Sequence, residues 1–61
     1  LLYAKKEIEK LGYEVYIQPN GKSIKFIFKQ KVVTLFPYSG WHTGASIIDG
    51  RGLHKLLNQL K

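Results

Sequence analysis

Residues 13–29, YEVYIQPNGKSIKFIFK, determine how the rest of the chain must fold. Apolar and polar residues alternate on both sides of Asn20-Gly21, and this dipeptide is the strongest short signal for a tight hairpin turn. With these two residues as the loop, each inward residue meets another inward residue: Ile17 with Ile24, Val15 with Phe26, and Tyr13 with Phe28. A slip of one residue would turn all of them outward, so the sequence predicts a single register.

A third strand is predicted downstream of the hairpin, over residues 31–36, KVVTLF. A tight turn after Phe28 would set Val33 opposite it and continue the apolar face. Pro37 cannot donate a backbone hydrogen bond, so we expect it to end the sheet. The predicted sheet has three antiparallel strands and one apolar face.

Two short helices are predicted to flank the strands. Residues 1–11 place an apolar stripe at helical spacing (Leu1, Ala4, Ile8 and Leu11), and Gly12 follows as a left-handed cap. Residues 51–60 carry a second stripe, made of leucines. Because both stripes must be buried on the one apolar face, we expect a single α+β domain over residues 1–61, a two-layer α-β-β-β-α sandwich with both helices on one face of the sheet.

The net charge of +6 is unevenly distributed. Lysines and glutamates balance in residues 1–20, whereas residues 21–61 hold all of the excess and one acid, Asp49. Segregated positive charge is typical of proteins that bind a polyanion, although a basic protein without an anionic partner has the same composition. The lysines that would supply the long-range field are Lys22, Lys25, Lys29 and Lys31.

The composition also limits the class of protein. The chain has no cysteine and no visible signal peptide, and no apolar run approaches the roughly 18 residues that a membrane span needs. We therefore expect a cytoplasmic protein with no membrane partner. Histidines and acids are too few for a convincing metal site, so no metal or other cofactor is predicted.

The glycine-rich segment PYSGWHTGASIIDGRGLHKL, residues 37–56, reads as a loop that leads into the second helix. Asp49 is placed to cap that helix, but Arg51 would oppose the helix dipole by about 0.3–1 kcal/mol. Broken local rules such as this one favour a functional site. We predict a phosphate held by Arg51, Lys55 and the backbone of Gly50 and Gly52. The alternative is a tight turn closed by a contact between Asp49 and Arg51.

Trp41 and His42 lie in the same segment. Trp41 could stack on an exposed base while His42 contacts base or sugar; alternatively, Trp41 covers the edge of a small core. His42 and His54 could act as acid and base, but no cysteine, second carboxylate or nucleophile accompanies them. The sequence therefore predicts no enzyme.

The face of the predicted sheet that points away from the helices is unusually apolar. Alternation turns these side chains outward: Tyr16, Lys25, Ile27, Val32, Thr34 and Phe36. Contiguous apolar residues facing solvent usually mark a partner site. The face could be a platform for stacked bases, a homodimer or other protein interface, or a surface covered by residues outside this chain. We favour the protein interface, formed by Tyr16, Ile27, Val32 and Phe36.

The segments KLGYEV, VVTLFP and GRGLHKLLNQLK occur in the order that two related families use. The chain resembles the double-stranded-RNA-binding domain and, more closely, the HicA-type toxin, a small mRNA interferase of the same layout. These resemblances imply an α-β-β-β-α domain that contacts RNA. HicA-type toxins carry their catalytic histidine at the start of the second strand, where residues 21–24 read GKSI here, so ribonuclease chemistry is not implied. The segment GWHTGASIIDGRG is similar to one in short uncharacterised phage proteins.

These features together predict a small basic nucleic-acid-binding module without catalysis, with phosphate held at the start of the second helix. The alternative is a protein-interaction module, such as a phage-type inhibitor or assembly factor, that binds or dimerises through the open face of the sheet. The sequence does not distinguish DNA from RNA or single from double strands.

Overall fold

The computed structural model describes residues 2–61, so the first position of the predicted apolar stripe, Leu1, lies outside the described residues. The elements are α1 (Leu2–Lys10), β1 (Val15–Ile17), β2 (Ile24–Phe28), β3 (Lys31–Phe36), β4 (Trp41–Gly44), β5 (Gly50–Arg51) and α2 (Leu53–Leu60). The strands form one antiparallel sheet in the order β1-β2-β3-β4-β5. Neither helix in this part of the chain is long and apolar enough to cross a membrane.

The β1–β2 hairpin has the predicted register, with Val15 opposite Phe26, but its turn is of another type. A two-residue type I′ turn needs positive φ at both loop residues. In Asn20-Gly21 only Gly21 has one, at 68°. The Gly21 N–H donates to the carbonyl of Gln18 at 2.9 Å, which makes a wider loop that preserves the same pairing.

The β2–β3 hairpin contains the two-residue turn that the first hairpin lacks. Phe28 pairs with Lys31, and the residues between them, Lys29 and Gln30, have φ of 51° and 68°. Both values are positive, as a type I′ turn requires. The predicted pairing of Val33 with Phe28 is therefore wrong by two residues. The inward face is unaffected, because a shift of two keeps each side chain on its own side of the sheet.

The prediction of a three-stranded sheet is wrong, because the glycine-rich segment adds two strands. Pro37 does follow the end of β3, but the Gly40 N–H donates to the carbonyl of Phe36 at 2.8 Å and closes a turn. This turn brings Trp41–Gly44 back along β3 as β4, and Gly50–Arg51 then pairs with β4 as β5. The proline ends one strand without ending the sheet.

The second helix begins later than predicted, at Leu53, because Arg51 belongs to β5. Gly52 is the N-cap residue, with φ 106° and ψ 124°, and no side chain caps the helix. The prediction that Asp49 caps α2 is therefore wrong. Its Oδ1 accepts a hydrogen bond from the Gly44 N–H at 3.3 Å, so Asp49 stabilises the β4–β5 connection instead.

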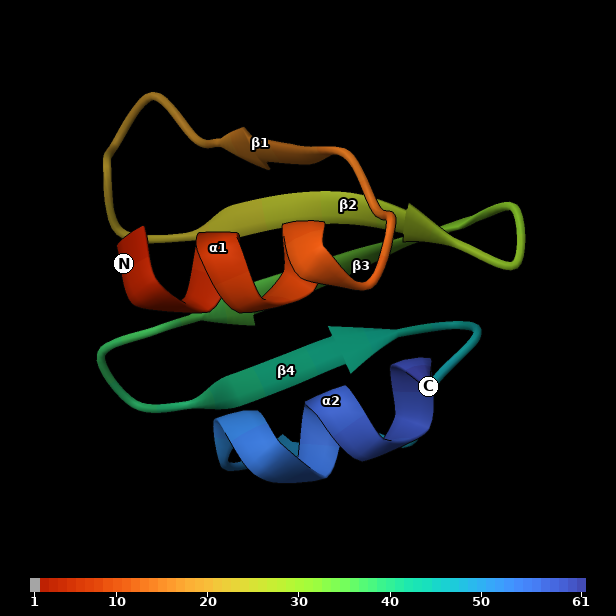
Figure 1. The fold of residues 1–61 in the computed structure, drawn as a ribbon. Helices are drawn as coiled ribbons and strands as arrows, with labels where there is room; N and C mark the ends of the chain where they lie inside the picture. Colours follow the sequence, from red (N-terminus) through yellow and green to blue (C-terminus); the bar gives the residue numbers. More distant parts are fainter. Residues whose placement is uncertain (1) are drawn as a thin grey trace.

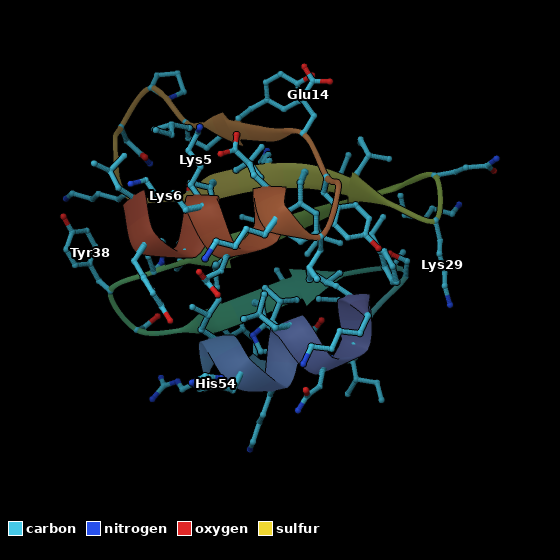
Figure 2. All side chains as sticks on the ribbon, viewed as in Figure 1. Lys5, Lys6, Glu14, Lys29, Tyr38 and His54 are labelled. Atoms are coloured by element: carbon cyan, nitrogen blue, oxygen red, sulfur yellow. The ribbon has the colours of Figure 1, made fainter. Side chains whose placement is uncertain are left out.

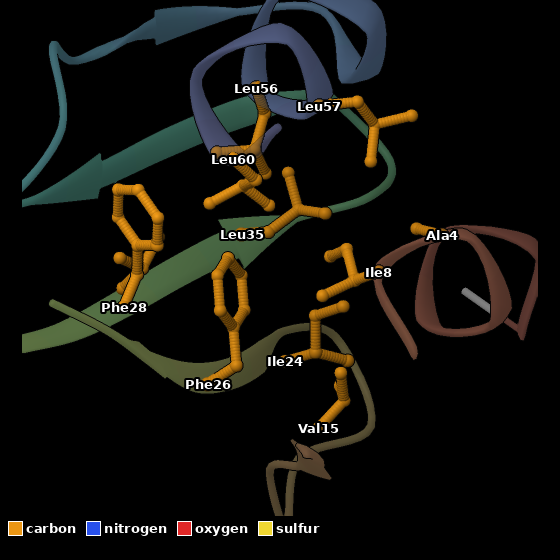
Figure 3. Close-up of a cluster of buried hydrophobic side chains, with 11 residues drawn as sticks. Ala4, Ile8, Val15, Ile24, Phe26, Phe28, Leu35, Leu56, Leu57 and Leu60 are labelled. Carbon is orange, nitrogen blue, oxygen red and sulfur yellow. The ribbon is translucent and has the colours of Figure 1, made fainter. Parts of the chain in front are cut away.

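Both helices lie on one face of the sheet (Figure 1), and the core fills the space between the two layers (Figure 3). Its buried side chains come from both helices and the first three strands: Ala4, Ile8, Val15, Ile24, Phe26, Phe28, Val33, Leu35, Leu56, Leu57 and Leu60. Tyr13 packs against this cluster, and its hydroxyl donates to the Leu60 carbonyl at 2.8 Å. No described element covers the other face of the sheet (Figure 1).

Candidate binding surface on the open face of the sheet

The open face of the sheet is the face that points away from the two helices. Side chains alternate along a strand, and directly paired residues share a face. The observed register therefore assigns these residues to the open face: Tyr16, Lys25, Ile27, Val32, Thr34, Phe36, Trp41, Thr43 and Arg51. All the residues that alternation predicted for this face belong to it, and β4 and β5 contribute Trp41, Thr43 and Arg51.

One row of the open face, the aromatic row, crosses β3, β4 and β5 and sets two aromatic rings beside a guanidinium. Phe36 pairs with Trp41, and Trp41 pairs with Arg51. Both aromatic side chains are 38% exposed. Cβ atoms of directly paired residues are about 4.5–5.5 Å apart, so the three side chains form a continuous surface. Trp41 faces away from the core, which excludes the alternative that it covers the core's edge.

The next row, the polar row, consists of Tyr16, Lys25, Thr34 and Thr43, one from each of the first four strands. Tyr16, at the β1 end of this row, is 54% exposed. A hydrogen bond to Glu14, followed by the negative charge of that carboxylate, raises the pKa of Tyr16 above its ordinary value. The phenol thus donates its hydrogen bond to a carboxylate at the edge of this row.

The last row, the aliphatic row, is the pair Ile27 and Val32. Each side chain is 51% exposed. An isolated exposed aliphatic residue is ordinary on a protein surface, but a contiguous patch is not. The polar row separates this pair from the aromatic row.

The open face carries two cations, while Glu14 lies next to it as the hydrogen-bond acceptor of Tyr16. Lys25 and Arg51 lie on it, and its three rows contain no carboxylate. On the helix side, Lys5 pairs with Glu9 and Lys10 with Glu7, both at 2.9 Å within α1, whereas Lys55 adds a positive charge to α2, which contains no acid. Figure 2 shows Lys5 and Lys6 on α1 and Lys29 at the tip of the β2–β3 turn, all away from the open face.

The phosphate site predicted at the start of α2 is rearranged in the structure. The Gly52 N–H donates to the carbonyl of Gly40 at 3.0 Å, so this amide is not free to bind an anion. Arg51 lies on the open face rather than in the first turn of α2. Because Asp49 binds the backbone within its own connection, the alternative contact between Asp49 and Arg51 is also not found among residues 2–61.

The remaining predicted nucleic-acid contacts are dispersed. His42 is 1% exposed, and its Nδ1 lies 3.1 Å from the carbonyl oxygen of Gly40 on the helix side of the sheet. It is therefore buried away from any ligand on the open face, and the contact predicted for it is wrong. Lys55 is exposed on α2, which covers the opposite face, and Lys22 is exposed in the β1–β2 loop. Of the predicted lysines, Lys25 lies on the open face.

Sequence reasoning divided one surface into two sites. Phe36 was predicted to belong to a protein interface, Arg51 to a phosphate site and Trp41 to a base contact, whereas in the structure Trp41 pairs with both of the others. It missed Thr43 entirely. In the structure Trp41 and Thr43 point outward and His42 points inward, but the residue types in WHTG do not alternate between apolar and polar, so the sequence carried no strand signal there.

No family model, curated protein or solved structure matches the chain. The resemblances to the double-stranded-RNA-binding domain, HicA-type toxins and short phage proteins therefore stay predictions from sequence pattern. Within residues 2–61 no three histidine or acidic side chains are grouped so that they could hold a metal ion, and no pocket is present. The candidate binding site is therefore the open face, with its exposed aromatic row and its two cations.

Proposed function

We propose that this protein binds nucleic acid through the open face of its sheet, with no catalytic step. The observation that carries the proposal is the position of Trp41 between Phe36 and Arg51. A nucleotide combines a flat base with an anionic phosphate. Stacking on an aromatic side chain contributes about 1–3 kcal/mol per base, and a guanidinium binds phosphate through charge-assisted hydrogen bonds.

The charge of the surface supports the same partner. Lys25 and Arg51 provide two cations in rows that hold no carboxylate, and the chain as a whole carries a net charge of +6. Such a field attracts polyanions over a distance of about a Debye length, roughly 10 Å at 0.1 M salt. The chain has no cysteine, and from this we infer that such a binder acts in the cytoplasm.

The proposal is tested by the fluorescence anisotropy of labelled 12-nucleotide DNA and RNA at low salt. We expect Trp41→Ala and Arg51→Ala each to weaken binding by about 5- to 150-fold, the equivalent of 1–3 kcal/mol. Both variants should keep the wild-type circular dichroism spectrum, because both side chains lie outside the core.

Matched control variants remove an aromatic ring or a positive charge from parts of the molecule outside the open face. Tyr38→Ala deletes an aromatic side chain that is 82% exposed in the β3–β4 turn, and Lys6→Ala deletes one positive charge on α1 (Figure 2). Both should bind within about twofold of wild type, since neither side chain belongs to the open face. The proposal fails if neither oligonucleotide binds, or if the controls lose as much affinity as the open-face variants.

A second candidate, a protein-interaction module, is favoured by the aliphatic row alone. Ile27 and Val32 are each half exposed, and their row contains no cation. An apolar pair without charge is expected at the centre of a protein interface. The measurement is the molecular mass in solution up to about 200 µM protein. A dimer that Ile27→Glu converts to a monomer would support this candidate, and a monomer at every concentration would exclude self-association.

A further inference from the structure

We infer that the ligand of the open face is a short single strand, about four nucleotides long, rather than a duplex. This inference rests on the proposed function and adds to it the form of nucleic acid that is bound. Three properties of the described residues carry it: the exposure of the aromatic row, the shape of the face, and the number and separation of its cations.

The aromatic row can stack only on a base whose flat face is accessible. In a duplex the base faces are occupied by neighbouring base pairs, and proteins reach sequence mainly through the groove edges. Single strands present their bases to aromatic side chains on an open surface. Phe36 and Trp41, both 38% exposed and directly paired, therefore match an unstacked strand.

The shape of the face argues against groove binding. Proteins that read a duplex insert a helix, a β-ribbon or a loop into a groove. Both helices of this chain lie on the opposite side of the sheet (Figure 1), so neither can enter a groove contacted by the open face. The β2–β3 connection is a two-residue turn, Lys29-Gln30, which is too short to reach deeply into one.

The cations set the size of the site. Arg51 on β5 and Lys25 on β2 are three strand spacings apart and two residues out of line, which corresponds to a separation of about 16 Å. Two phosphate contacts over this distance fit the small end of the range for single-strand binders, about four nucleotides. A strand bound in this way crosses the sheet from β5 toward β2, over the aromatic and polar rows.

The test is a titration of the full chain that follows the fluorescence of Trp41, the one tryptophan in the sequence. The probes are oligothymidines of 2, 4, 8 and 12 nucleotides, the matching oligouridines, and a 12-base-pair duplex. We expect the single strands to quench Trp41, with affinity per site levelling off near four nucleotides, and the duplex to bind at least tenfold more weakly without quenching. With two phosphate contacts, the slope of log K against log salt should be about −1.4.

The outcomes separate this inference from the proposed function. The single-strand inference is wrong, while nucleic-acid binding stands, if the duplex binds as tightly as the single strands. The same conclusion follows if the slope of log K against log salt is more negative than about −4. If no probe binds at 50 mM salt, the proposed function fails as well. Arg51→Gln gives an independent check, because removing one of two phosphate contacts should reduce the salt slope by about half.

Discussion

Two strand glycines, Gly44 and Gly50, should respond in opposite ways to the same substitution by alanine. Neither has a positive φ, so any difference comes from the space around the added methyl group. At Gly44 a Cβ would lie 2.9 Å from the carbonyl oxygen of Val32 and 3.2 Å from the Cα of Val33. At Gly50 the nearest atom, the Nε2 of His42, is at an ordinary contact distance of 3.5 Å.

The expected sizes follow from these distances. Overpacking against backbone costs about 1–3 kcal/mol, and replacing glycine by alanine returns about 0.4–1 kcal/mol by restricting the unfolded chain. Gly44→Ala should therefore destabilise the fold by about 1–2 kcal/mol, and Gly50→Ala should stabilise it by up to about 1 kcal/mol. A domain of this size has a total stability of only about 3–9 kcal/mol, so both changes are measurable.

Thermal unfolding followed by circular dichroism measures the difference. Each kcal/mol shifts the midpoint by about 4–8 °C in a domain of this length. The Gly44 variant should melt below wild type and the Gly50 variant at or above it. Equal midpoints for the two variants would show that β4 does not pack against β3 at Gly44 as described, and would also put the position of Trp41 on the open face in doubt.

Three further changes test other parts of the structure. Gln30→Gly should raise the midpoint by about 2–8 °C, because glycine adopts the left-handed conformation of this turn position without strain; a lower midpoint would contradict the type I′ turn. Tyr13→Phe should destabilise by about 0.5–1.5 kcal/mol in urea unfolding, through loss of the 2.8 Å hydrogen bond to the Leu60 carbonyl; an unchanged midpoint would mean that water replaces this bond at no cost. Glu14→Gln should lower the pKa of Tyr16, because the bonded carboxylate is what raises it; alkaline titrations followed at 295 nm should show the Tyr16 phenol ionising at lower pH in the variant than in wild type, and identical titration curves would contradict the contact.

The parts of the fold set by alternation could be predicted from the sequence. The register of the first hairpin is fixed by pairs of inward residues, so Val15 opposite Phe26 was predictable even though the turn type was not. The outward position of Ile27 and Val32 follows from the same alternation. Both signals depend on side chains that must be either buried or exposed.

The parts set by backbone contacts could not be predicted in the same way. In residues 40–52 glycines remove the side chains whose pattern would reveal a strand, and β5 is only two residues long. Arg51 was therefore assigned to a helix, and Asp49 to its cap, because an acid before an apolar stripe is a usual start of a helix. What places Arg51 in β5 is its pairing with Trp41 and the backbone hydrogen bond between Gly52 and Gly40, neither of which leaves a periodic trace in the sequence.

The contact between Gly40 and Gly52 also gives this surface a signature that can be searched for. Each glycine is adjacent in sequence to one member of the aromatic row, Gly40 to Trp41 and Gly52 to Arg51. A Cβ on Gly40 would come within 3.0 Å of the Gly52 nitrogen, so the dipeptides Gly-Trp and Arg-Gly form one structural unit across the β4–β5 connection. A diverged chain that retains both dipeptides at this spacing would keep its indole beside its guanidinium, even where every other position of the sheet has been replaced.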